Sequence, residues 1–363
     1  MENKPLLSIC IPTYNRANIV YECVRECLKL PYDWIEVVVT NNCSSDNTAQ
    51  ILSGINDPRF KLFHNESNIG YENLTKCLTN GSGKFCLLLG DEDSFLNTDW
   101  DSVKKQLEND KNTAVFQFTY FDTKGKQLFG TIEQFILQNT FEAFKKAYNN
   151  FAFSAGMVIR KEILDICWKE AIRKPLLWSL YNERIIPIYS VKYGDYAILN
   201  NISSHRTKRD GSGYLDSSAW CGTMAEPYWS MQSRKKQFEE WIEFFSEFDV
   251  DYKMKVKLAE VIIHDAILFL SGYYGILYAR NTDSPLFKKY KELILRDRKE
   301  LRFKWIRSSY EMYAEIREKF AQHFESYNKL EYNKVVILAF MRMYLSFAKK
   351  IVRSALVFLH VMR

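Results

Sequence analysis

The sequence predicts an α/β protein with a Rossmann-like, mostly parallel sheet flanked by helices, followed by a mainly helical C-terminal region. Leu6–Ile11 and Ile35–Thr40 are apolar runs of β-forming residues, as expected of buried strands. Ala17–Leu30 between them has helical spacing, so the first forty residues predict a βαβ unit and hence a parallel sheet. From about Tyr228 onward the apolar pattern is helical.

The remaining elements follow in order. Further strands are expected at Phe60–His64, Phe85–Leu89, Val115–Phe121, Gly156–Ile159 and Ala197–Ile202, and helices up to about Ser53 and over Asn73–Asn80. The sheet is expected to end near residue 205. The stretch from His205 to Cys221 mixes Gly, Ser and charge without periodicity, which predicts a mobile loop. Helical repeats are expected over Trp241–Phe248, Val256–Leu277 and Tyr310–Phe324.

Length and composition indicate a globular chain with more than one part. At 363 residues, with 47% hydrophobic and 26% charged residues, it exceeds one typical domain. We predict a sheet domain over residues 1–224, a helical region of unknown role over 225–335, and a basic amphipathic helix over 336–363. The eight cysteines lack paired spacing, and the start lacks the features of a signal peptide, so we expect reduced thiols and a cytoplasmic protein.

Three consecutive acids carry the strongest chemical signal. Asp91, Glu92 and Asp93 follow the apolar run Phe85–Leu89 directly after Gly90. Because burying unpaired carboxylates is costly, they should face solvent, a cation or hydrogen-bond donors. Two carboxylates at i and i+2 can present oxygens to Mn²⁺ or Mg²⁺ whose remaining ligands come from a diphosphate. The alternative is a solvated acidic turn that caps the next helix.

Four sequence blocks, in order, extend this signal: Ser8–Arg16 (SICIPTYNR), Glu36–Asp46 (EVVVTNNCSSD), Asn68–Gly70 with Asn73, and Gly83–Asp93. Together they resemble the family 2 glycosyltransferases, inverting enzymes of the GT-A fold. The resemblance is specific over roughly residues 5 to 100. A weaker continuation at Phe153–Lys161 carries it to about residue 206.

The resemblance implies roles for residues at the carboxyl ends of the strands. Pro12, Thr13 and Tyr14 would border the nucleotide base, with Tyr14 stacking on uracil. Asp91 would lie near the ribose and Asp93 would hold the metal on the donor diphosphate. The other residues expected on the donor side are Asn15, Asn41, Asn42, Asn68, Gly70, Asn73 and Glu92.

One residue departs from the family pattern. Asn41 stands where the family usually has an acid that accepts a hydrogen bond from the base. The Asn carbonyl can still accept that bond and its amide can donate one. Uracil is therefore favoured, while cytosine and thymine stay open, and Asn42 is the neighbouring candidate.

An inverting transfer also needs a general base for the acceptor hydroxyl. The first choice is Glu183 and the second Asp195; the competing interpretation of Glu183 is a surface residue paired with Arg184. By the resemblance, His205 is a candidate metal ligand and Arg206 a candidate phosphate partner. The alternative for both is an ordinary exposed loop.

The C-terminal segment is basic and apolar. After Glu331 there is no acidic residue, and an apolar stripe recurs at helical spacing through Phe340, Tyr344, Phe347, Ile351, Ala355, Phe358 and Met362. Six basic residues follow Glu331: Lys334, Arg342, Lys349, Lys350, Arg353 and Arg363. This pattern suits the anionic inner face of a cytoplasmic membrane. The alternative is a terminal helix packed on its own domain.

We therefore predict an inverting, metal-dependent transferase. It would move a sugar from a nucleotide-sugar, UDP-sugar being favoured, to a glycan or lipid-linked acceptor in surface polysaccharide or lipooligosaccharide synthesis. One alternative is a non-catalytic glycan- or nucleotide-sugar-binding scaffold, which Asn41 favours. A nucleotidyltransferase would favour a Gly-rich, basic loop after its first strand, and a nucleic-acid partner is not expected.

Overall fold

The structure is a computed structural model. It describes residues 4–70, 72–95, 98–121, 127–129, 135–150, 155–171, 182–207, 230–270, 288–303, 337, 341 and 345, some of them by their backbone alone. The chain divides into two compact units, Met1–Thr223 and Met224–Arg363, which are taken separately below.

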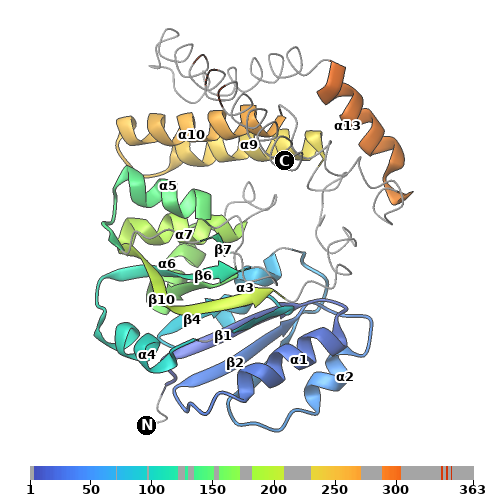
Figure 1. Cartoon of the computed structure of the whole chain (residues 1–363), viewed down its shortest axis with the longest axis vertical. Coiled ribbons are helices and arrows are strands. Elements are labelled where there is room, and N and C mark those ends of the chain that lie inside the picture. The colour runs from blue at the N-terminus through green and yellow to red at the C-terminus, as the bar shows by residue number, and fades with distance from the viewer. Residues whose placement is uncertain are drawn as a thin grey trace, which may run out of the picture. The chain divides into compact units, whose positions relative to one another are not determined.

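The first unit is built on one sheet (Figure 1). Its strand order is β3-β2-β1-β4-β9-β6-β10-β5, with β7 beside β6 and β8 beside β10. β1, β2, β3, β4, β6 and β10 share one direction, whereas β9 and β5 run antiparallel to their neighbours. The bounds are β1 Leu7–Thr13, β2 Ile35–Asn41, β3 Phe60–His64, β4 Phe85–Leu88, β5 Asp93–Phe95, β6 Thr113–Phe121, β7 Gln127–Phe129, β8 Phe135–Ile136, β9 Met157–Arg160 and β10 Asp195–Thr207.

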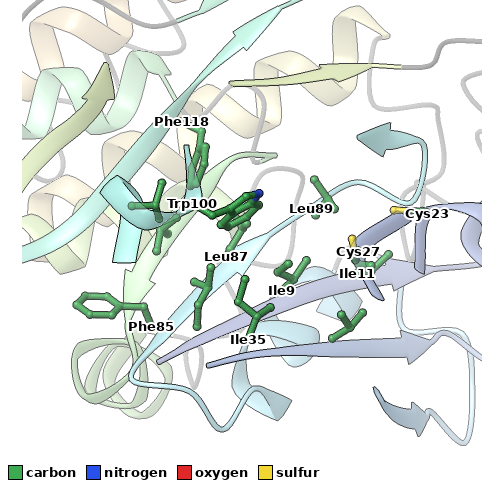
Figure 2. Close-up of a cluster of buried hydrophobic side chains, with 14 of the residues drawn as sticks. Ile9, Ile11, Cys23, Cys27, Ile35, Phe85, Leu87, Leu89, Trp100 and Phe118 are labelled. Carbon is green, nitrogen blue, oxygen red and sulfur yellow. The ribbon is translucent and has the colours of Figure 1, made fainter. Parts of the chain in front are cut away.

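Helices cover both faces of this sheet because the strands are apolar on both sides. On one face, side chains of α1 and α4 join alternate strand residues such as Ile9 and Leu87 in one core (Figure 2). In this core Trp100 packs edge-on against Phe95. On the other face Cys77 of α3 donates to the Val38 carbonyl, and α6 and α7 pack beside α3. The bounds are α1 Ala17–Leu28, α2 Thr48–Ser53, α3 Glu72–Asn80, α4 Trp100–Asn109, α5 Phe141–Asn150, α6 Lys161–Ala171 and α7 Asn182–Tyr193.

The second unit is helical where it is described, with α9 at Met231–Glu247, α10 at Tyr252–Leu270 and α13 at Lys291–Phe303. On α9, Trp241, Phe244 and Phe245 form a buried aromatic cluster with Phe248 just beyond it. Within the described part of the chain, no helix combines the length and apolarity needed to cross a membrane. The helix expected at Tyr310–Phe324 lies outside the described residues.

The mostly parallel sheet and the βαβ start are confirmed. One alternative and one expectation are wrong. The alternative of an acidic turn that caps the next helix is wrong, because the turn leads into the short strand β5, in which Asp93–Phe95 pairs with β10. The last strand runs on to Thr207, so His205 and Arg206 are strand residues and not the start of a loop; residues 208–221 lie outside the described part.

Candidate functional site

The candidate site lies at the carboxyl ends of the parallel strands. β1 ends at Thr13, β2 ends at Asn41, and β4 is followed by Gly90 and the acidic motif Asp91–Asp93. β1 pairs with both β2 and β4, so the residues that follow these strands meet at one edge of the sheet. This is the edge at which open α/β sheets bind ligands.

Asp91 is buried at this edge and bonded from the β1 side. Its side chain is 8% exposed; Thr13 Oγ1 donates to Asp91 Oδ2 at 2.9 Å, and the Arg16 guanidinium pairs with Oδ1. The second guanidinium nitrogen lies 2.8 Å from Glu92 Oε2. Burial raises the pKa of Asp91, against the lowering effect of Arg16 and Thr13. Sequence reasoning assigned no role to Arg16, and its only signal was its position directly after Pro12–Asn15.

Asp93 begins β5 and is 4% exposed. Its backbone N–H donates to the Gly90 carbonyl at 3.0 Å, and the Cys23 thiol of α1 donates to the Asp93 carbonyl at 3.5 Å. Gly90 leaves room for the carboxylate, because a Cβ at residue 90 would lie only 2.6 Å from Asp93 Oδ2. The tight turn and the buried thiol therefore hold the backbone of Asp93, and Gly90 leaves space for its carboxylate.

The end of β10 lies beside Asp93. In the antiparallel pairing of β10 with β5, Thr207 is opposite Asp93, Arg206 opposite Ser94, and His205 opposite Phe95. The strand register thus places His205 and Arg206 next to the acidic segment. These two residues are described by their backbone only.

Asn41 closes the site on the β2 side. It is buried, accepts from the Ser44 N–H through Oδ1 at 3.1 Å, and its Nδ2 lies 3.3 Å from His64 Nδ1. Asn15, in the left-handed conformation with φ of 52°, accepts from the Ser45 N–H at 2.7 Å. The loops after β1 and β2 are therefore joined at the site. Pro12 and Tyr14 are half-buried at the end of β1.

The other predicted asparagines form a network of their own. Asn42 uses its whole carboxamide: Nδ2 donates to Asn68 Oδ1 and the Gly70 carbonyl, and Oδ1 accepts from Asn65 and the Ile69 N–H. Asn73 accepts from Asn65 Nδ2 at 2.8 Å and donates to the Thr40 carbonyl at 3.1 Å. These contacts tie residues 65–73 to the end of β2, so Asn42, Asn68, Gly70 and Asn73 shape the loop beside the site.

Comparison with known protein families identifies the family of the segment that carries this edge of the sheet. The sequence model of Glycosyl transferase family 2 matches residues 8–167, which include β1, β2, β4 and the acidic motif. The chain contains a glycosyl transferase family 2 domain. The family predicted from the sequence blocks is thereby confirmed.

Curated relatives of the family 2 domain match shorter stretches. The putative colanic acid biosynthesis glycosyl transferase WcaA of Escherichia coli K12 is 33% identical over 72 residues, 19% of this chain and 26% of the relative. The putative teichuronic acid biosynthesis glycosyltransferase TuaG of Bacillus subtilis 168 is 28% identical over 120 residues, 32% of this chain and 46% of the relative. The chain thus spans less than half the length of these relatives.

A solved structure extends the likeness beyond the family 2 domain. S. aureus TarS 1–349, solved in complex with UDP-GlcNAc, superimposes with a TM-score of 0.54 at 15% identity and covers 88% of this chain and 89% of its own. At that identity the likeness shows the fold alone. The predicted GT-A-like, mostly parallel sheet flanked by helices is confirmed.

The structure separates the two candidate bases, Glu183 and Asp195, both of which follow the residues matched by the family 2 model. Asp195 begins β10, opposite Thr113 at the start of β6, and its Oδ1 accepts from the Gln138 N–H at 2.9 Å. Since Thr207 at the far end of β10 pairs with Asp93, Asp195 lies at the opposite edge of the sheet and not at the site. Glu183 lies in the first turn of α7, at the opposite end of that helix from the start of β10, and only its backbone is described.

The residues at the acidic edge suit a divalent ion that is completed by a ligand. Among the described residues no group of three or more His, Cys, Asp or Glu side chains could hold a metal by itself. Both Asp91 oxygens are engaged, by Thr13 and by Arg16, and Asp93 is the second buried carboxylate at this edge. A hard cation held by one carboxylate takes its other oxygens from water and from substrate phosphates.

Proposed function

We propose that the chain is an inverting glycosyltransferase that transfers a sugar from a nucleotide-sugar, with a UDP-sugar as the favoured donor, to a glycan or lipid-linked acceptor. The observation that carries this is the buried pair Asp91 and Asp93, at the same edge as Thr13 and Asn41, in a family 2 domain. The names of WcaA and TuaG support a product in surface polysaccharide or lipooligosaccharide synthesis. The UDP-GlcNAc bound to TarS supports a UDP-sugar donor.

In this reaction an acceptor hydroxyl oxygen bonds to the anomeric carbon while the bond from that carbon to the diphosphate breaks. The electron pair leaves with the nucleoside diphosphate, and the hydroxyl proton passes to a carboxylate base. Glu183 is the candidate base, since Asp195 lies at the other edge of the sheet. Thr13, Tyr14 and Asn41 border the base of the donor.

Asp93 would hold Mn²⁺ or Mg²⁺ on the donor diphosphate. Such an ion supplies Lewis-acid neutralisation of the charge that develops on the leaving group. Arg206 and His205, placed beside Asp93 by the register of β10 and β5, are the proposed phosphate partner and further ligand. Arg16 and Thr13 engage both oxygens of Asp91, and Asp93 is the acid proposed to act toward the donor.

The test is release of nucleoside diphosphate from UDP-, GDP-, CDP- and dTDP-sugars by purified protein, with Mn²⁺ or with chelator. Metal-dependent release from a UDP-sugar supports the proposal, and Asp93→Asn should abolish it. Asp99→Asn is the matched control, because Asp99 is an exposed cap of α4 that accepts from the Ser102 N–H and Asn caps equally well. Nucleotide binding without release under every acceptor tried would favour the non-catalytic scaffold.

The proposed place of action is the cytoplasmic face of a membrane. Ile337, Met341 and Leu345 are helical, spaced by four residues, and 55–60% exposed, which places them on one side of a helix. They lie in the acid-free basic segment after Glu331, and apolar and cationic groups together suit anionic lipid. The seven described cysteines are free thiols, as in a reducing compartment.

Flotation with vesicles tests this placement. Binding should be strong to phosphatidylglycerol vesicles, weak to phosphatidylcholine vesicles, and reduced by replacing Ile337, Met341 and Leu345 together with Ser. Leu137→Ser is the control, because Leu137 is a comparably exposed apolar residue of the first unit. Equal flotation of the triple variant and the unmodified chain would refute a membrane role for these three side chains.

A further inference from the structure

Arg16 joins two parts of the site that come from distant parts of the chain. It is the last residue of the loop between β1 and α1, directly after Thr13, Tyr14 and Asn15. Its guanidinium reaches the acidic motif 75 residues further along, pairing with Asp91 and Glu92 through separate nitrogens. The side chain is 19% exposed, so these ion pairs are largely withdrawn from water.

Burial strengthens the two ion pairs of Arg16. The side chains of Asp91 and Glu92 are 8% and 15% exposed, so solvent screens these pairs much less than it screens a surface pair. Burial alone would favour the neutral guanidine, yet the carboxylates of Asp91 and Glu92 outweigh it and raise the pKa of Arg16. The charge on Arg16 is therefore fixed across the working pH range.

We infer that Arg16 is a positioning residue whose two ion pairs hold the Thr13–Arg16 loop against the acidic motif before the donor arrives. This inference rests on the proposed function and goes beyond it. The loop carries Tyr14, which would border the nucleotide base, while the motif carries Asp93, which would hold the metal. Arg16 thus sets the distance between the base-binding and diphosphate-binding halves of the site.

The planar fork of arginine is what the geometry requires. Two nitrogens of one guanidinium contact two different carboxylates, whereas a lysine ammonium is a single point charge on a flexible stem. A lysine at residue 16 can keep the charge but cannot keep both contacts. Loss of a preset loop adds an ordering cost to each binding event and so weakens binding of the nucleotide.

The experiment measures the Kd of UDP in the presence of Mn²⁺ by calorimetry for the unmodified chain, Arg16→Met and Arg16→Lys. We expect the Kd to rise about tenfold in Arg16→Met and about threefold in Arg16→Lys, in line with lost preorganisation. Where turnover is measured, the KM for the donor should rise more than kcat falls. If Arg16 had a merely structural role, its substitution would lower Tm but leave both the Kd of UDP and the KM for the donor unchanged.

Arg59→Met is the matched control. Arg59 is also a partly buried arginine, and it pairs with Asp57 and donates to the Leu28 and Leu30 carbonyls. These carbonyls lie at the C-terminal end of α1, whereas Arg16 precedes its N-terminal end. Its loss should lower Tm without changing the Kd of UDP. An unchanged Kd in folded Arg16→Met overturns the inference. If Arg16→Met does not fold, an unchanged Kd in Arg16→Lys overturns it, whereas failure of the unmodified chain to bind any nucleotide overturns the proposed function itself.

Discussion

Gly90 is the residue at which a single added methyl group should separate function from stability. An alanine Cβ there would lie 2.6 Å from Asp93 Oδ2, and the next atoms it meets, Cγ and Cβ of Asp93 at 3.3 and 4.0 Å, belong to the same side chain. The clash therefore falls on the end of one side chain and not on backbone. Gly90 is also absent from the described residues with positive φ, so alanine fits the backbone.

The size of the effect follows from this distance. To reach an ordinary contact of about 3.4 Å, the carboxylate oxygen must move by about 0.8 Å. Since a displacement of about 1 Å at a reacting centre can cost about a hundredfold in rate, we expect Gly90→Ala to lower kcat/KM by about 10- to 100-fold. The free energy of unfolding should change by less than about 1 kcal/mol, because a rotated side chain relieves the contact.

Gly54→Ala is the control for Gly90→Ala. A Cβ at Gly54 would meet only the Ile51 carbonyl oxygen at 3.5 Å, and Gly54 has the right-handed conformation, with φ of −78°, at the end of α2. Alanine there should leave the rate unchanged and stabilise by about 0.4–1 kcal/mol through the unfolded chain. The assays are metal-dependent release of nucleoside diphosphate and urea unfolding. Full activity and unchanged metal dependence in Gly90→Ala would refute a role for the position of Asp93.

Two further predictions concern stability. Glu36→Ala should lower the free energy of unfolding by about 2–4 kcal/mol in urea titrations, since Glu36 is buried and accepts from Ser8 Oγ at 2.5 Å and from the Ser82 N–H at 2.7 Å; a loss below about 0.5 kcal/mol would contradict this. Hydrogen bonding to Arg59 lowers the pKa of Asp57 in the folded state. Asp57 therefore makes a small contribution to the free energy of unfolding above about pH 4, where the unfolded carboxyl is ionised, and this contribution is lost as the pH falls through the folded pKa. Asp57→Asn should therefore be less stable than the unmodified chain at pH 7 and equal to it at pH 2, and a difference that persists at pH 2 would show another cause.

The parallel core of the fold could be predicted because local patterns and tertiary packing agree there. β3 was expected at Phe60–His64 and has those bounds; α1 and β2 begin at the expected residue and end within two residues of it, and β1 differs by one residue at its start and two at its end. Apolar runs bounded by polar turns leave little freedom in such elements. β5 was missed because its three residues are strand only through pairing with β10, which lies more than a hundred residues further along.

The sequence predicted which residues lie at the candidate site but not which side chains contact one another there. The sequence indicated that Asp91, Asp93, Thr13 and Asn41 follow neighbouring strands, and topology alone then brings them to one edge. It could not show that Arg16 engages Asp91, because that contact depends on which way a long side chain turns. The sequence also could not show that Asp195 lies away from the site. Asp195 begins β10, which is 13 residues long, so the two ends of this strand lie at opposite edges of the sheet.

Asn41 and Asn42 are adjacent in sequence, yet their bonding predicts opposite tolerance of a negative charge. Asn42 is buried, donates two hydrogen bonds and accepts two, so Asn42→Asp loses both donors, sets a buried carboxylate oxygen against the Asn68 Oδ1 and Gly70 carbonyl oxygens, and should cost about 2–4 kcal/mol. Asn41→Asp keeps the oxygen that accepts from the Ser44 N–H and places a carboxylate beside the His64 ring, at a cost below about 1 kcal/mol. Urea unfolding measures both, and equal losses would refute the distinction. If Asn41→Asp keeps the fold as expected, stability does not require asparagine at residue 41, and the residue can instead contribute to donor selection. Asn41→Asp is therefore the variant in which to measure a changed preference among UDP-, CDP- and dTDP-sugars.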